Sequence, residues 1–170
     1  MPSIELICVD QKEPLQFSDF PFAICAEQQL NSYRSPSLFQ RDFENLRGCI
    51  YHLGNPGFDD PNHEGLYFAY ELLSERCRDN IPPRFLEFAP EFLPAIFDLI
   101  GLLLAASPAQ LVIFTTDWQC GPKSARRYRQ IGEQTFWQRH ANLKLHLNAL
   151  YPIRTDARCT DAKHPSKSDR

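Results

Sequence analysis

The sequence predicts an α+β fold in which a mixed β-sheet of about five strands has about three helices packed on it. Two helix-to-strand units, at 36–53 and 91–117, indicate the mixed sheet. A clean alternation of apolar and polar residues over 143–149 is typical of a strand with one face in water. Since the chain has 170 residues, we expect a single domain over 1–154 and a disordered polar tail over 155–170.

The most apolar stretch of the chain, 90–118, is expected to form the centre of this fold. Apolar residues recur there at three- and four-residue steps, which predicts a buried helix. Pro94 suits the first turn of that helix because it has no N–H to donate, and Ser107-Pro108 should end it. The β-branched run at 111–114 follows, and it predicts a central strand buried on both faces.

Asp98 places a charge within the predicted core helix. The charge-free run that follows it, 99–106, has 8 residues, whereas a membrane span needs roughly 18 or more, so no span is expected. Asp98 lies near Gly101 and Ala105 on the side of the helix that carries small residues. Two interpretations of this side stay open: an edge that faces water, or a floor for a ligand or a closely approaching helix.

The other predicted elements are shorter. Apolar runs bounded by polar or turn residues predict strands at 4–9, 20–25 and 49–53. Capping residues and prolines followed by a helical stripe predict helices at 36–47 and 61–77, and a further helix is expected at 133–140. The run at 66–70 also allows a strand, and 84–88 is a short strand or an extended lead into the core helix. We expect a hairpin-like loop at 10–19 and the end of the last strand at Tyr151-Pro152.

Cysteine usage and the first residues indicate a cytoplasmic protein. The chain has 6 cysteines, and no pair has the C-x-x-C spacing of a zinc knuckle or a redox motif. Cys8, Cys25 and Cys49 each lie within an apolar, strand-like run, which favours buried free thiols in a reducing cytosol. The segment 1–10 lacks the basic start and the long apolar run of a secretory signal.

The charges are divided unevenly between the two parts of the chain. The net charge is −3, with 16 acidic and 7 basic residues in 1–100 (−9) and 5 acidic and 11 basic residues in 101–170 (+6). Such asymmetry is typical of two surfaces with different partners. The alternative is that the two parts interleave in the fold and neutralise each other.

The basic segment 123–144 interleaves cationic side chains with Tyr128, Phe136 and Trp137. Cations that meet phosphates and rings that stack on bases are the features of a nucleic-acid surface. An exposed basic face with core aromatics explains the same pattern. The acidic balance of the whole chain and its pI near 5.9 disfavour nucleic-acid binding.

No motif for catalysis, metal binding or cofactor binding is present. Carboxylates and imidazoles cluster within one short stretch, where they could bind a divalent metal or act as acid and base: His52, Asp59, Asp60, His63 and Glu64. The two histidines are 11 residues apart, which is no zincin spacing, and turn or capping roles explain the aspartates. A nucleophile elbow and a phosphate-binding loop are absent, so we predict no catalytic residue, no metal and no cofactor.

The profile that remains is that of a small protein-binding module. Bacterial immunity proteins and antitoxins, single domains that occlude the active site of a toxin, commonly have this profile, although no residue pattern identifies a family here. An acidic surface would steer a partner with a basic surface, and Trp118, where a buried strand reaches a loop, would anchor it. The predicted partner-binding residues are Asp59, Asp60, Glu64, Glu71 and Trp118. The alternatives are a small enzyme with a site assembled from distant residues and a nucleic-acid binder that uses 123–144.

Overall fold

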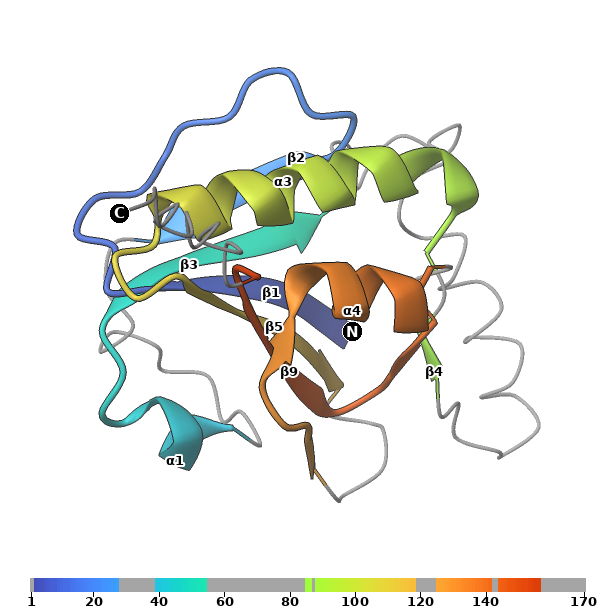
Figure 1. The fold of residues 1–170 in the computed structure, drawn as a ribbon. Helices are drawn as coiled ribbons and strands as arrows, with labels where there is room; N and C mark the ends of the chain where they lie inside the picture. The colour runs from blue at the N-terminus through green and yellow to red at the C-terminus, as the bar shows by residue number, and fades with distance from the viewer. Residues whose placement is uncertain are drawn as a thin grey trace, which may run out of the picture.

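A seven-stranded mixed sheet with the strand order β2-β3-β1-β5-β9-β6, in which β7 also pairs with β9, forms the centre of the protein. The computed structural model describes residues 2–27, 39–54, 85–86, 88–118, 125–141 and 144–156 (Figure 1). The strands of this sheet are β1 (Pro2–Val9), β2 (Ala23–Glu27), β3 (Gly48–Gly54), β5 (Leu111–Trp118), β6 (Arg126–Arg127), β7 (Ile131–Gly132) and β9 (Ala149–Arg154). A separate two-stranded sheet pairs β4 (Phe85–Leu86) with β8 (Leu145–His146).

The helices of the described residues are α1 (Gln40–Phe43), the 3-10 turn η2 (Pro90–Phe92), α3 (Leu93–Ala106) and α4 (Glu133–Arg139). The predicted α+β fold with a mixed sheet and about three helices is therefore confirmed. The sheet is mixed because β6 and β7 run parallel to β9, whereas the pairs formed by β1, β2, β3, β5 and β9 are antiparallel. No helix of the described residues is long and apolar enough to cross a membrane.

The two faces of the sheet bury two different sets of side chains, because successive residues of a strand point to opposite faces. One face of β1 places Leu6 and Cys8 in the larger core cluster beneath α3 and α4. The other face places Ile7 and Val9 in a smaller cluster with Phe39 and Phe43 of the α1 region. Figure 1 shows α3 and α4 on one side of the sheet and α1 on the other. The helices of the described residues therefore pack on both faces of the sheet.

The predicted core helix and strand are confirmed as α3 and β5, and both are tied to β1. The Oγ atom of Ser107, directly after α3, donates to the carbonyl of Val9 at 2.7 Å and accepts from the N–H of Leu111 at 3.1 Å. The thiol of Cys8 donates to the carbonyl of Leu103 at 3.2 Å. These contacts fix the end of α3 against the centre of the sheet, so the opposite side of the helix faces outward.

The predicted alternating strand at 143–149 is wrong, because Asn148 breaks it. Asn148 has a φ of 53°, a left-handed conformation that ends β8 and turns the chain into β9. The hydroxyl of Thr116 supports the turn by donating to the carbonyl of His146 at 2.6 Å and accepting from the N–H of Ala149 at 3.2 Å. Pro152, which was expected to end the strand, lies inside β9 between the short stretches that pair with β6 and β7.

The second strand and the loop before it also differ from the prediction. β2 begins at Ala23 rather than Phe20, because the rings of Phe20 and Phe22 pack on each other at 5.6 Å between ring centroids. Pro21, which has no N–H, lies between them outside the sheet ladder. The loop 10–19 is not a hairpin, because β3 lies between β1 and β2 and pairs with both.

Several predicted segments lie partly or wholly outside the described residues. This holds for 36–38 of the helix predicted at 36–47, for the helix at 61–77 and for the tail from 157 onward. The described part of 36–47 is helical only at α1, so that helix is shorter than predicted. Gly48, which was expected to end a helix, is the first residue of β3, with a φ of 147°. Asp156, placed in the predicted tail, is described and accepts a hydrogen bond from the N–H of Gln134 at 2.8 Å.

The cysteines of the described residues lie in two different environments. Cys8 and Cys49 are buried opposite each other on β1 and β3, as expected, whereas Cys25 on β2 is exposed, which corrects the prediction for that thiol. Burial raises the pKa of the Cys8 thiol to about 12 and raises that of Cys49 as well. Since the thiolate is the reactive species, the buried pair should be inert in the folded protein.

Thiol labelling should therefore separate Cys25 from the buried pair. We expect iodoacetamide at about pH 8 to modify Cys25 within minutes and to leave Cys8 and Cys49 unmodified until the protein is unfolded in urea. Peptide mapping by mass spectrometry measures the three sites separately. Alkylation of Cys8 in the folded protein at the rate of Cys25 would contradict the buried position of β1.

Candidate functional site

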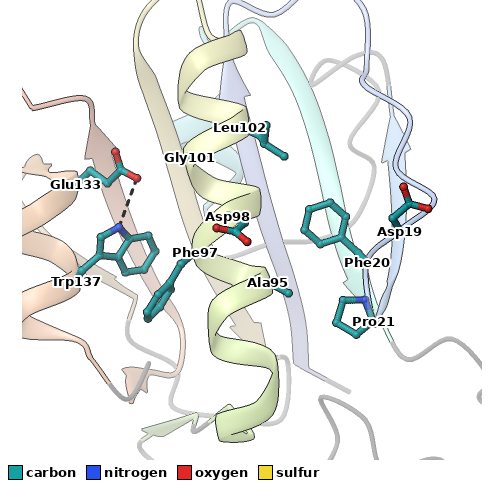
Figure 2. A pocket seen from close by; sticks show the side chains of 10 residues that line it. All are labelled: Asp19, Phe20, Pro21, Ala95, Phe97, Asp98, Gly101, Leu102, Glu133 and Trp137. Carbon is teal, nitrogen blue, oxygen red and sulfur yellow. Dashed lines mark hydrogen bonds between the residues drawn. The ribbon is translucent and has the colours of Figure 1, made fainter.

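A groove of about 740 Å³ crosses the outward side of α3 and is open to solvent. Figure 2 shows α3 as its floor, with α4 on one side and the segment before β2 on the other. Its lining combines apolar, aromatic and acidic side chains: Asp19, Phe20, Pro21, Ala95, Phe97, Asp98, Gly101, Leu102, Glu133 and Trp137. Concave surfaces with an apolar lining and a few polar groups are the usual form of binding sites.

The floor of the groove is the side of α3 that turns away from the sheet. Ile96, Leu99 and Ile100 point into the core, which leaves Asp98, Gly101 and Leu102 on the outward side. Leu102 is 49% exposed, although a leucine on a core helix is ordinarily buried. The interpretation of Asp98 and Gly101 as the floor of a binding site therefore agrees with their place in the groove.

The first wall is the segment Asp19–Pro21, which the buried side chain of Tyr51 helps to hold over the sheet. The hydroxyl of Tyr51 accepts from the N–H of Leu15 at 2.8 Å and donates to Oε1 of Gln11 at 2.6 Å. Burial raises the pKa of this hydroxyl to about 12, so it stays protonated and keeps its donor role. The ring of Phe17 contacts both Tyr51 and Phe20, at centroid distances of 5.8 and 5.3 Å. The loop is thus anchored just before it reaches the groove.

The second wall is α4, which is fixed at its start and along its inner face. The carboxylate of Asp156 accepts from the N–H of Gln134 and caps the first turn of the helix. Phe136 is fully buried in the larger core cluster. The next residue, Trp137, contacts Phe97 of α3 at a centroid distance of 4.0 Å. This ring pair joins α4 to α3 at the edge of the groove.

Glu133 closes the space between the two helices. A Cβ atom on Gly101 would lie 3.5 Å from Oε1 of Glu133, so the carboxylate lies directly beside the backbone of α3. The same oxygen accepts a hydrogen bond from the indole N–H of Trp137 at 3.4 Å (Figure 2). With Asp19 and Asp98, the groove has three carboxylates in its lining and no basic side chain. The site therefore favours an apolar ligand that carries positive charge.

The described residues do not test the five residues predicted to bind a partner. Asp59, Asp60, Glu64 and Glu71 fall outside the described residues, so their role stays a prediction. Trp118 is the last residue of β5, where the strand ends, and its side chain is outside the described part.

The groove residues that the sequence did not identify come from three separate segments. Phe20 and Trp137 were assigned to a strand and a basic helix, and Glu133 only marked a helix start. The signal available in the sequence was the small-residue side of the core helix at Asp98 and Gly101. Nothing local indicates that Glu133 faces that side.

Within the basic segment, Arg127 has a structural partner. Its Nε and Nη2 atoms donate to the two carboxylate oxygens of Asp42 at 2.7 and 2.8 Å, and the guanidinium lies 5.9 Å from the centroid of the Phe39 ring. The hydrogen bonds to Asp42 raise the pKa of Arg127 above its ordinary value. Arg127 therefore ties the α1 region to β6.

The rings of the basic segment also pack against protein neighbours. Tyr128 stacks on the buried Tyr151 at a centroid distance of 4.4 Å, and Phe136 is fully buried. Trp137 contacts Phe97 but stays partly exposed, so its ring can still meet a ligand. Bases stack on rings whose faces are open, so the contacts of Tyr128 and Phe136 favour the interpretation of an exposed basic face with core aromatics.

His52 has a carboxylate partner on β1. Its Nδ1 atom lies 3.4 Å from Oε1 of Glu5, which is only 2% exposed. The hydroxyl of the buried Thr115 donates to the other carboxylate oxygen at 3.3 Å. A carboxylate that orients an imidazole is a common arrangement in acid–base catalysis. In the described part of the chain, no three metal-ligating side chains cluster.

His140, at the end of α4, couples the stability of the protein to pH. Burial lowers its pKa below the ordinary 6.5, and the nearby charges of Arg139 and His146 act in the same direction, whereas the bond to the backbone of Lys144 opposes them. The unfolded chain therefore binds the proton more readily than the folded one. The stability that the neutral imidazole contributes is therefore present above about pH 6.5 and is lost as the pH falls through the lowered pKa of the folded protein.

Replacing His140 with Gln should remove this part of the pH dependence. We expect the urea midpoint of the natural protein to fall between pH 7.5 and pH 5.5, and the fall to be smaller in His140→Gln. Chemical denaturation at the two pH values, followed by circular dichroism, measures both. An equal fall in the two proteins would show that His140 is not the responsible group.

Comparison with known proteins gives no further guide, because no protein-family model, no curated protein sequence and no solved structure matches the chain.

Proposed function

We propose that this protein is a small protein-binding module that docks a partner on the groove across α3. The single observation that carries the proposal is Leu102, an exposed leucine on the central helix that shares the groove lining with aromatic rings and carboxylates. An apolar anchor point within a polar rim is the usual anatomy of a protein interface. The walls are held by buried contacts, so the free groove is close to the form that a partner would meet.

The type of module that fits this proposal is one that occludes its partner, as bacterial immunity proteins and antitoxins do. The supporting features are the small size of the chain, the lack of catalytic motifs and the unequal charge of its two parts. A cytoplasmic location belongs to the same proposal, with free, buried Cys8 and Cys49 in its support.

A capture experiment with two matched variants tests the proposal. The natural protein, Leu102→Glu and Leu15→Glu are tagged and used to capture partners from a lysate of the native host, with identification by mass spectrometry. Leu102 and Leu15 are both exposed leucines, at 49% and 38%, but only Leu102 lines the groove. We expect one dominant protein with the natural chain and with Leu15→Glu, and about tenfold or greater loss with Leu102→Glu.

Two results would contradict docking on the groove. One is capture of the same protein at undiminished level by Leu102→Glu. The other is equal loss with both variants, since the side chain of Leu15 is not part of the groove lining. Recovery of nucleic acid in place of a protein would support the basic segment 123–144 as the functional surface.

A small enzyme is the second candidate, and the Glu5–His52 pair is the observation in its favour. An imidazole oriented by a buried carboxylate can act as a general base. Under this alternative, a substrate screen would give turnover that is lost in His52→Gln and kept in Leu102→Glu. Turnover that persists in His52→Gln would show that the Glu5–His52 pair is not catalytic.

A further inference from the structure

We propose that the occupant of the groove is a basic, apolar segment of the partner protein, with an arginine side chain inserted between Asp98 and Glu133 against the Phe97–Trp137 ring pair. The inference rests on the proposed function, because it names the chemistry of the partner that docks on the same surface. It assigns the acidic end of the groove to the arginine and the apolar end, at Leu102 and the segment Phe20–Pro21, to a neighbouring apolar residue.

The acidic lining of the groove determines the sign of the charge that the partner segment carries. Asp19, Asp98 and Glu133 contribute three carboxylates to the lining, and no lysine, arginine or histidine is among the ten lining residues. A cationic segment is attracted to such a surface, whereas a phosphate or an acidic segment is repelled by it. A partner with a basic surface therefore fits this groove.

The placement of two carboxylates around Gly101 locates the cation. Residues three apart on a helix lie on the same side, so Asp98 is one turn from Gly101. Oε1 of Glu133 reaches the same turn from α4, since a Cβ atom on Gly101 would lie 3.5 Å from it, at ordinary contact distance. Figure 2 shows Glu133 beside α3 and Asp98 on it, so a cation placed over this turn would lie between the two carboxylates.

The ring pair selects arginine over a compact ammonium ion. Phe97 and Trp137 lie 4.0 Å apart between centroids at one edge of the groove, and the indole N–H of Trp137 is bonded to Glu133. A guanidinium is planar, stacks on aromatic rings and forms paired hydrogen bonds with carboxylates. The hydrogen bond to the indole uses one site of the Glu133 carboxylate, which accepts several. Rings and carboxylates together thus match the two properties of an arginine head group.

The apolar end of the groove would contact the residue next to the arginine in the partner segment. Leu102 lies one residue beyond Gly101, on the side of α3 that faces Phe20 and Pro21 (Figure 2). An apolar side chain next to the arginine would cover Leu102 and remove its exposed surface from water. The partner segment is therefore basic and apolar, rather than basic alone.

Two tripeptides test the inference directly. The probes are acetyl-Leu-Arg-Leu-amide and the neutral isostere in which citrulline replaces arginine. The indole N–H signal of Trp137 serves as the reporter in nitrogen-15 NMR, assigned as the indole signal that remains in Trp118→Phe. We expect a saturable shift with the arginine peptide, binding at least about fivefold weaker with the citrulline peptide, and weaker arginine binding at high salt.

Matched variants assign the effect to the groove. Asp98→Asn and Glu133→Gln should each reduce the preference for arginine over citrulline. Glu91→Gln removes an exposed carboxylate of η2 that is absent from the lining, and it should leave the preference unchanged. Equal binding of the two peptides, no saturable shift with either, or an equal effect of Glu91→Gln would overturn the inference.

The outcomes separate the inference from the proposed function. If Leu102→Glu abolishes capture of a protein partner but arginine and citrulline bind alike, docking on the groove stands and the arginine site is wrong. If the arginine preference is present but capture does not depend on Leu102, the arginine site stands and the groove is not the docking surface of a protein partner. Tighter binding of acetyl-Leu-Glu-Leu-amide would contradict a basic partner altogether.

Discussion

Replacing Ile100 with Asp is expected to leave the protein unfolded at room temperature. Ile100 is fully buried on the inner side of α3, within the larger core cluster. The variant would place a carboxylate there without a partner, at a cost of several kcal/mol or more against a total stability of roughly 5–15 kcal/mol. Circular dichroism and the dispersion of amide signals in NMR measure the loss of the fold.

Leu102→Asp is the matched control for Ile100→Asp. It introduces the same carboxylate on the same helix two residues later, where the leucine is 49% exposed and the charge stays in water. We expect this variant to fold and to melt close to the natural protein, within about 1 kcal/mol. A folded Ile100→Asp with an unchanged melting temperature would show that α3 is not the central helix of the core.

Replacing Phe136 with Ala should destabilise the protein by about 3–5 kcal/mol, which is the usual cost of removing a fully buried ring. Phe136 holds α4 to the sheet through its contact with Tyr151 of β9, at a centroid distance of 6.1 Å. It also packs beside Trp137 and His140 of its own helix, at 4.8 and 4.9 Å. Because α4 supplies Glu133 and Trp137, the variant should also weaken the arginine preference of the groove. Urea denaturation measures the first effect and the tripeptide titration the second.

Gln138→Ala controls for changes in helix propensity, because Gln138 is an exposed residue of the same helix. We expect its free energy of unfolding to stay within about 0.5 kcal/mol of the natural value. A Phe136→Ala variant with unchanged stability would contradict the packing of α4 on the sheet. A destabilised variant that keeps the full arginine preference would instead show that the groove does not need the position of α4.

The elements that were predicted well are those whose signals are local. The stripe of apolar residues in α3, Pro94 in its first turn and Ser107 after its end are all contained in one short segment. The β-branched run of β5 and the apolar runs of β1 and β3 are equally local. Such patterns indicate which side of a segment is buried, and this side is the same whichever element the segment packs against.

The errors arise where a distant contact outweighs the local pattern. The alternation at 143–149 continued through Asn148, but the hydroxyl of Thr116 and the left-handed backbone of Asn148 make a turn there. In the apolar run at 20–25, Phe22 packs against Phe92 of η2 at a centroid distance of 6.3 Å before the strand begins. In both places the contacting residue lies far away in the sequence, so the pattern of neighbouring residues does not indicate it.

The candidate site also combines residues that the local sequence predicted with residues that only the tertiary structure brings together. The sequence was sufficient to place Asp98 and Gly101 on the small-residue side of the core helix and to raise a binding floor as one interpretation. It could not decide between that floor and an edge in water, because the decision depends on what stands beside the helix. Glu133 and Phe20 arrive there through the order of the strands and the packing of α4. Local patterning specifies which surfaces are buried, whereas only the packing of distant elements creates a concave surface between them.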